Sequence, residues 1–314
     1  MRRPSNIAGV IEVEGLTQRY GSYTAVQDLS FLLGAGEVVG FLGPNGAGKT
    51  TTLRVLASAL APSSGTVRVG GHDVLREPVA AREVLGYLPE RCPLYPELLV
   101  EEALDFIARI RGLDPCARRE ARGRVVDLCG LGEVLGRACG DLSKGFRQRV
   151  GIACALIHDP PVLLLDEPTS GLDPHQVREV RALVRALGEE RTVLFSSHVL
   201  SDVEATCRRV LVLHQGRLIA DDALESLERR VRGGAVRFRC AAFADEERAR
   251  LETLPGVRAL RAEPDGGWTV FPEEEVDDLP ERLFRFAVAE GLLLTELAPA
   301  RVTLEDVFLH LTRA

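Results

Sequence analysis

Lysine is almost missing from this chain of 314 residues. Of its 39 basic residues, only Lys49 and Lys144 are lysines, and all the others are arginines. Arginine presents a planar fork of donors, whereas lysine carries a compact ammonium group on a flexible stem, so the two are not interchangeable at a binding site. Unless chance placed them, these two lysines mark positions that exclude arginine.

Long apolar runs are also missing. The longest uninterrupted ones, such as residues 38–43 and 162–165, are far shorter than the roughly 18 residues that a membrane-spanning helix needs. Arg2 and Arg3 resemble the start of a signal peptide, but no apolar segment follows them. The sequence therefore predicts a protein that stays in the cytoplasm.

Cysteine pairs with the spacing of metal or redox sites are absent as well. The seven cysteines are scattered, with no C-x-x-C pair and no matching histidines. Free cysteines are usually buried and act as small apolar side chains. We therefore expect these cysteines to be reduced and mostly buried.

The chain lacks the positive charge of a nucleic-acid-binding protein. Its formal net charge is −7, and the acidic excess lies mainly after residue 235. Nucleic-acid-binding domains usually carry a basic patch that neutralises phosphates. Nucleic acid is therefore not an expected partner.

The pattern along the chain favours one large core and a second, smaller one. Residues 37–42 are typical of a buried strand, a glycine-rich loop follows, and apolar residues recur at helical spacing from 53 to 60. The stretch 97–151 is helical in pattern and rich in arginine. Three further runs are typical of buried strands between helices: 162–165, 192–196 and 210–213. This order predicts an α/β sheet with a helical insertion.

Beyond a charged linker at residues 228–234 the pattern changes. We expect the order strand, helix, strand, strand, helix, strand at 235–240, 245–254, 257–262, 268–271, 277–290 and 292–297. That order favours a small βαββαβ domain of the ferredoxin-like type. The acidic stretch 273–278 is expected to be a solvated helix start, and a short helix at 304–311 would close the chain.

Residues 43–50, GPNGAGKT, match the pattern G-x-x-x-x-G-K-[ST] between the expected strand and helix. Glycines there let backbone N–H groups surround phosphate oxygens, and the helix start adds its positive dipole. Lys49 would reach the β and γ phosphates, and Thr50 would offer its hydroxyl to Mg²⁺. The alternative is a glycine-rich turn with no binding role, but such a turn would not account for the lysine at position 49. The predicted ATP-binding residues of this loop are Gly43, Pro44, Asn45, Gly46, Ala47, Gly48, Lys49, Thr50 and Thr51.

A second motif ends the buried run at 162–165 in two carboxylates, Asp166 and Glu167. Ligands of α/β sheets bind at the carboxyl ends of the strands. Asp166 would hold Mg²⁺, and Glu167 would act as general base towards the attacking water. Adjacent acids after a strand are often only a solvated strand end, but the phosphate loop makes the functional reading the better one.

Together these motifs resemble the ATP-binding subunits of ABC transporters. The phosphate loop, LSKGFRQ at 142–148, the acid pair, SGLD at 170–173 and SSH at 196–198 occur in that family's order. The resemblance covers roughly residues 10–230. It implies a P-loop NTPase fold with a RecA-like core and a helical subdomain at about 97–151. We expect an ATP-binding domain at 1–230 and an accessory α+β domain at 235–314.

The resemblance implies roles for single residues. Tyr20 would stack on adenine, although a tyrosine in an early hairpin can be merely structural. His198 would contact the γ-phosphate, so that Glu167, His198 and Lys49 are the predicted catalytic set. Glu90, in GYLPE, stands where most of the family has a glutamine that senses Mg²⁺. Glutamate keeps an acceptor oxygen but loses the amide donor.

The signature segment implies a dimer with two ATP molecules at its interface. Ser143, Lys144 and Gly145 would grip the γ-phosphate of the ATP held by a second subunit through the start of a helix. Ser143 would also suit the N-cap of that helix, and both roles can hold. Asp173 belongs to the loop that links the two sites. The implied partner is a second copy or a paired cassette.

Finer features resemble the exporter branch that includes drug-efflux and gliding-motility ATPases: the lysine and phenylalanine of the signature, GYLPE, and TLEDVFL at 303–309. In that branch the permease is a separate polypeptide. Residues 90–101 would contribute to its docking groove. The leading hypothesis is an ATP-hydrolysing exporter subunit, peripheral on the inner face of the cell membrane.

Two alternatives remain open. The first is a soluble ATPase of this family that acts in translation, repair or immunity without a permease. The second is a degenerate cassette that binds ATP and only gates a partner. One set of motifs and no sustained heptads weigh against the first. The intact Lys49, Asp166, Glu167 and His198 weigh against the second.

Overall fold

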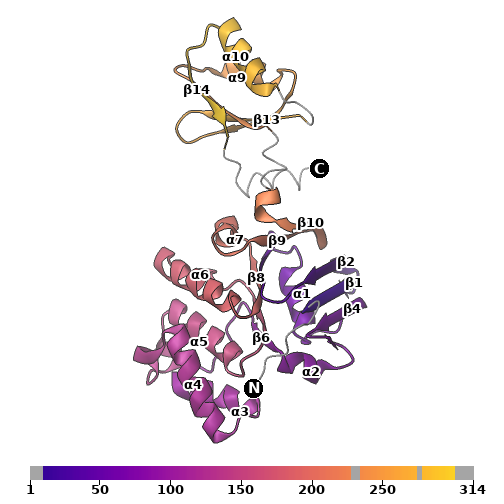
Figure 1. Cartoon of the computed structure of the whole chain (residues 1–314), viewed down its shortest axis with the longest axis vertical. Coiled ribbons are helices and arrows are strands. Elements are labelled where there is room, and N and C mark those ends of the chain that lie inside the picture. Colours follow the sequence, from indigo (N-terminus) through magenta and orange to yellow (C-terminus); the bar gives the residue numbers. More distant parts are fainter. Residues whose placement is uncertain (1–9, 228–233, 274–277, 301–314) are drawn as a thin grey trace. The chain divides into compact units, whose positions relative to one another are not determined.

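The computed structural model describes residues 10–227, 234–273 and 278–300 (Figure 1). The chain divides into two compact units, Met1–Ala223 and Leu224–Ala314. The expected linker lies almost wholly outside the described residues, as do the helix expected at 304–311 and most of the acidic stretch 273–278.

The first unit is built on a six-stranded sheet in the order β10-β9-β3-β8-β7-β6. Neighbours from β9 to β6 run parallel, and only β10 at the edge is antiparallel. Their bounds are β3 Val38–Leu42, β6 Leu85–Leu88, β7 Val162–Leu165, β8 Thr192–Ser197, β9 Arg209–His214 and β10 Arg217–Ala223. Every residue of β7 and β8 is buried, as expected where helices cover both faces of a parallel sheet.

A smaller antiparallel sheet packs in the same unit, in the order β2-β1-β4-β5. Its strands are β1 Ile11–Tyr20, β2 Tyr23–Leu33, β4 Ser64–Val69 and β5 His72–Asp73. Helix α1, Lys49–Leu56, lies beside it in Figure 1. Leu53 and Leu56 of α1 share one core with Phe31 and Phe41, whose ring centroids are 6.1 Å apart. The loop before α1 is thus fixed by a packed helix.

The helical insertion consists of α3 Val100–Ile110, α4 Pro115–Cys129 and α5 Lys144–Leu156, which pack on one another at the lower left of Figure 1. Local sequence sets the ends of α4: the Asp114 carboxylate accepts hydrogen bonds from two backbone N–H groups, Pro115 opens the helix, and Gly130 ends it at φ +62°. The remaining helices are α2 Pro78–Glu83, α6 Pro174–Gly188 and α7 Leu200–Thr206.

The second unit begins with helical residues at 224–227, and from residue 235 on it has the element order expected from the sequence. The elements are β11 Val236–Cys240, α9 Asp245–Glu252, β12 Val257–Ala262, β13 Trp268–Pro272, α10 Leu279–Ala289 and β14 Leu294–Pro299. The antiparallel sheet has the order β12-β13-β11-β14. Phe238, Leu251, Leu283 and Phe286 lie in its own core, which shares no residue with the core of the first unit.

No helix in the described part of the chain is long and apolar enough to cross a bilayer. The cysteines are free thiols, and four of them are buried: Cys129, Cys139, Cys207 and Cys240. Cys116 is exposed, against the general expectation. Burial raises the pKa of Cys92 and of Cys129 to about 12, which keeps these thiols protonated and unreactive.

Candidate functional site

The glycine-rich loop runs from the end of β3 to the start of α1. Gly46 and Gly48 have φ +82° and +104°, a region that disfavours other residues. A Cβ on Gly48 would lie 2.6 Å from the carbonyl oxygen of Ala25, and one on Gly43 would lie 2.5 Å from that of Leu213. Backbone from β2 and from the end of β9 therefore closes on the loop, and only glycine fits at these two positions.

Lys49 is 6% exposed and lies inside this loop. Its Nζ donates to the carbonyl oxygens of Gly43 at 2.6 Å and Pro44 at 3.2 Å, and lies 3.3 Å from Glu167 Oε1. The ammonium group is thus held by short contacts from three sides.

Asp166 follows β7 and is fully buried. Its Oδ1 accepts hydrogen bonds from Ser196 Oγ at 2.7 Å and Thr50 Oγ1 at 3.2 Å. Its Oδ2 is buried with no hydrogen-bond partner among the described residues. Burial raises the pKa of this carboxyl, because a charged group loses its hydration there. A buried carboxylate oxygen without a donor beside a threonine hydroxyl suits a hard divalent cation such as Mg²⁺.

Glu167 adopts φ +50°, which is uncommon for a residue with a side chain. Its backbone N–H donates to Ser196 Oγ at 2.9 Å. Its Oε2 lies 2.7 Å from Nδ1 of His198, which comes directly after β8. The turn therefore directs the Glu167 carboxylate between Lys49 and His198. Glu167 is only 7% exposed.

Lys49, Glu167 and His198 line one cavity of about 610 Å³, a volume typical of small-molecule sites, whereas Asp166 is buried and does not line it. Of the predicted site residues, it is lined by Tyr20, the loop from Asn45 to Thr51, Glu90, Glu167 and His198. Sequence reasoning missed Tyr23 and Ala25, and it assigned Ser170 to the SGLD loop without predicting that it lines this cavity. Tyr23 could have been found, because it pairs with Tyr20 across a tight turn, and both rings are about half exposed.

The signature residues do not reach this cavity within one chain. Ser143 caps α5 by accepting a hydrogen bond from the Phe146 N–H at 3.3 Å. Asp173 caps α6 by accepting from two backbone N–H groups at 2.9 Å. The ammonium of Lys144 lies over Gly171, where a side chain would collide with it. Both segments have local structural roles, whatever they do in an assembly.

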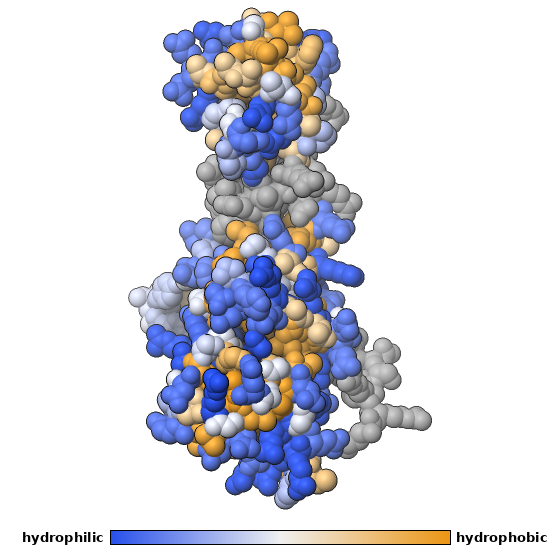
Figure 2. All heavy atoms as spheres, turned by 90° about the vertical axis from the view of Figure 1, so that its left-hand side faces the viewer, coloured by the Kyte–Doolittle hydropathy of each residue, from blue (hydrophilic) through white to orange (hydrophobic). Residues whose placement is uncertain are grey.

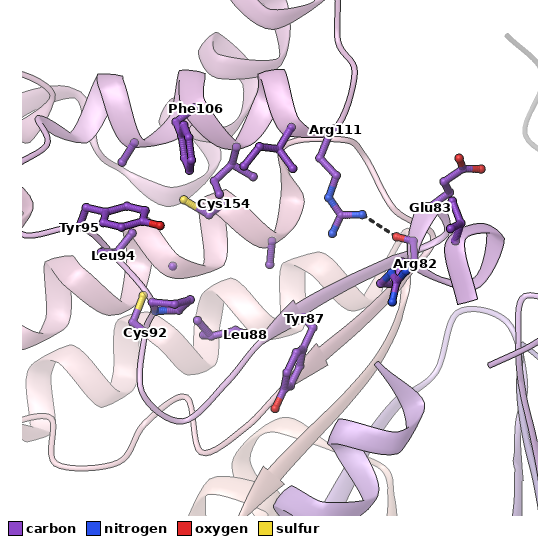
Figure 3. A pocket seen from close by; sticks show the side chains of 17 residues that line it. Arg82, Glu83, Tyr87, Leu88, Cys92, Leu94, Tyr95, Phe106, Arg111 and Cys154 are labelled. Carbon is purple, nitrogen blue, oxygen red and sulfur yellow. Dashed lines mark hydrogen bonds between the residues drawn. The ribbon is translucent and has the colours of Figure 1, made fainter. Parts of the chain in front are cut away.

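A second cavity, of about 500 Å³, lies between the parallel sheet and the helical insertion (Figure 3). Residues 92–95 line it, within the segment expected to meet a membrane partner. Four of its residues are large, exposed and apolar: Val79, Tyr95, Phe106 and Ile110. Tyr95 and Phe106 meet edge to face at 5.8 Å. Figure 2 shows apolar surface among charged residues on the side where α3, α4 and α5 lie.

Comparison with known proteins agrees with this geometry. The ABC transporter family model matches residues 26–170. The chain is 43% identical over 208 residues to the ABC transporter ATP-binding protein NatA of Bacillus subtilis, covering 65% of this chain and 83% of NatA. It is 32% identical over 306 residues to the bacitracin transport ATP-binding protein BcrA of Bacillus licheniformis, covering 96% and 97%.

A solved structure shares the fold of the first unit. It is a dimeric ATP-binding cassette in a post-hydrolysis state bound to ADP and Pi. Its TM-score is 0.63 at 24% identity, covering 68% of this chain and 98% of that cassette. The P-loop NTPase fold expected from the sequence is thereby confirmed. By its motifs, its fold and its similarity to relatives along almost its whole length, the chain belongs to the ATP-binding proteins of ABC transporters.

Proposed function

We propose that the chain binds and hydrolyses Mg-ATP as one of two paired subunits, and that this cycle drives export through a separately encoded membrane permease. The observation that carries the proposal is the position of Glu167, whose carboxylate lies 2.7 Å from His198 and 3.3 Å from Lys49 at the wall of the phosphate loop cavity. A base and a cation in this arrangement suit attack of water on a phosphate.

The glycine-rich loop before α1 would bind the phosphates of ATP. Its backbone N–H groups and the start of α1 would surround the phosphates, and Lys49 would neutralise the β and γ oxygens. Tyr20 would stack on adenine, with Tyr23 opposite it on the hairpin. Thr50, Asp166 and Glu90 would hold Mg²⁺, which neutralises charge on the phosphates when bound.

Hydrolysis would use Glu167 as general base. Its carboxylate would accept a proton from the attacking water as the water oxygen bonds to phosphorus and the bond to ADP breaks. His198 would hold the Glu167 carboxylate through Nδ1 and contact the terminal phosphate. General bases of this kind contribute about 10²- to 10⁴-fold to a rate.

Pairing of two chains would complete the site. The start of α5, with Ser143, Lys144 and Gly145, lies away from the cavity of its own chain, so it is available to the nucleotide of a second copy. Asp173 would lie in the loop between the two sites. The similarly folded cassette solved with ADP and Pi is a dimer.

The membrane partner would dock in the second cavity. This groove exposes Tyr95, Phe106 and Ile110 beside Arg111, a surface suited to a short amphipathic helix. The chain would then work at the inner face of the membrane without entering it. The relative BcrA is a bacitracin transport ATP-binding protein, which supports the general role of an exporter subunit for this chain.

The test compares wild type with Glu167→Gln and the exposed Glu189→Gln. Glu167→Gln should keep ATP affinity, lose at least about 100-fold in kcat, and accumulate an ATP-bound dimer that is visible by size-exclusion chromatography. Glu189→Gln should behave like wild type. Rapid turnover in Glu167→Gln would remove the assigned base.

A further inference from the structure

A further buried carboxylate belongs to α7 and lines neither cavity. Asp202 of α7 is 3% exposed. Its Oδ2 accepts a hydrogen bond from the Thr169 hydroxyl and lies 3.4 Å from Ser197 Oγ, whose one proton is shared with the Val199 carbonyl oxygen at 3.3 Å. Its Oδ1 accepts two hydrogen bonds from Arg181 of α6, one of them from Nε at 2.9 Å. Both carboxylate oxygens are therefore hydrogen-bonded to other residues of the chain.

The two hydroxyls belong to the two segments that carry Glu167 and His198, the turn after β7 and the end of β8. Thr169 lies two residues after Glu167, and Ser197 lies directly before His198. Asp202 thus connects the loop that follows β7 to the end of β8. Its position fixes the two backbones from which the Glu167 and His198 side chains extend towards each other.

Glu167 needs such a support. Its φ of +50° is a conformation that persists only when surrounding contacts hold it. On one side Ser196 Oγ accepts from the Glu167 N–H at 2.9 Å. On the other side the hydrogen bond from Thr169 to Asp202 is the side-chain contact that ties the turn to α7.

We propose that Thr169 and Asp202 form a positioning pair that sets the Glu167–His198 contact and so controls the rate of hydrolysis without contacting ATP. This inference rests on the proposed ATPase function. Neither side chain lines the nucleotide cavity. ATP affinity should therefore be independent of the pair, whereas kcat should depend on it, because a displacement of about 1 Å at a reacting group can cost about 100-fold in rate.

Thr169 is the better residue to change. Removing Asp202 would leave Arg181 without its buried partner and destabilise the fold. Thr169→Val keeps the size and shape of the side chain but removes the hydroxyl, and Thr169→Ser keeps the hydroxyl. A matched control is Thr206→Val in the same helix as Asp202, because the Thr206 hydroxyl is buried with no hydrogen-bond partner among the described residues.

The experiment measures kcat, KM and equilibrium ATP affinity for the full chain and the three variants. We expect Thr169→Val to lose about tenfold or more in kcat with unchanged ATP affinity, Thr169→Ser to keep most of the rate, and Thr206→Val to match wild type. Equal kcat in Thr169→Val and wild type, or equal losses in Thr169→Val and Thr169→Ser, would overturn the inference. Absence of hydrolysis in the wild type would instead refute the proposed function.

Discussion

Lys49 occupies a space that fits an ammonium group and excludes a guanidinium. Its Nζ is enclosed by the carbonyl oxygens of Gly43 and Pro44, and the side chain is 6% exposed. We expect Lys49→Arg to lose ATP affinity almost as severely as Lys49→Ala, by about 10- to 100-fold, although it keeps the charge. Titration with a fluorescent ATP analogue measures this loss.

The control for this prediction is Lys144→Arg, because Lys144 is the other lysine and is exposed. Within one chain, Lys144 does not line the cavity that contains Lys49. Binding to the monomer should therefore be unchanged by Lys144→Arg. Near-normal affinity in Lys49→Arg would show that the site requires charge and not shape.

The buried carboxylate of Asp166 destabilises the fold to an extent that depends on pH. Burial raises the pKa of its carboxyl, against hydrogen bonds from Ser196 and Thr50 that lower it. The folded protein therefore binds this proton more tightly than the unfolded chain does. The free energy of unfolding therefore falls as pH rises from the ordinary pKa of aspartate to the raised pKa of Asp166. It stays at this lower value at higher pH. Asp166→Asn removes this cost.

We therefore expect Asp166→Asn to melt at a higher temperature than wild type at pH 7, without Mg²⁺ or nucleotide. The difference in Tm should shrink as pH falls towards the ordinary pKa of aspartate. The same variant should lose Mg-dependent hydrolysis, and exposed Asp127→Asn is the control. A difference in Tm that is negative at pH 7, or constant with pH, would contradict this account.

At the scale of elements, the loop before α1 depends on close backbone approach. Gly48 combines φ +104° with a Cβ position 2.6 Å from the Ala25 carbonyl oxygen. Gly46 has φ +82° but nothing within 4 Å of its Cβ position. Gly46→Ala should cost only backbone strain, on the order of 1–2 kcal/mol. Gly48→Ala should cost more and abolish ATP binding.

Denaturant unfolding and ATP titration of the two alanine variants test this prediction. Both substitutions add one methyl group to the same loop, so their difference reports the collision with β2 together with the larger backbone strain at Gly48. If Gly46→Ala and Gly48→Ala were equally stable and bound ATP equally well, the loop would have to move freely away from β2.

The elements that sequence predicted are those whose signal is local. Strand β7 is a continuous apolar run, and Asp114, Pro115 and Gly130 mark both ends of α4. Strand β6 is as short as β7, but it went unrecognised because Gly86 interrupts its apolar run. That glycine is needed because the Ala155 carbonyl oxygen of α5 occupies the space of a Cβ. Such a contact between distant segments leaves no local pattern.

The site shows the same limit. Motifs predicted that Lys49, Asp166 and Glu167 lie together, since they follow the carboxyl ends of parallel strands β3 and β7 in one sheet. They did not indicate Asp202, because its partners Thr169 and Arg181 are far from it in sequence and meet it only through packing of α6 and α7. Polar residues without a motif are visible only in the folded chain.

The exposed wall of the second cavity, beside the helical insertion, can be tested as the docking surface. Ile110 of α3 is 64% exposed and lines the groove, whereas Val288 of α10 is 65% exposed and does not. Ile110→Asp should reduce co-purification with the membrane fraction while leaving ATP binding intact, because a charge opposes burial against an apolar partner. Val288→Asp should have no effect. Equal recovery of both variants would exclude this groove as the docking surface.

At the scale of the whole molecule, two units with separate cores should unfold separately. One core contains Phe41 and Leu53, and the other contains Phe238 and Phe286. Since the proposed Mg-ATP site is built from residues of the first unit, Mg-ATP should raise the temperature of one calorimetric transition and leave the other in place. A fragment of residues 224–314 should reproduce the unshifted transition. One cooperative transition that moves as a whole with Mg-ATP would show instead that the two units are coupled thermodynamically.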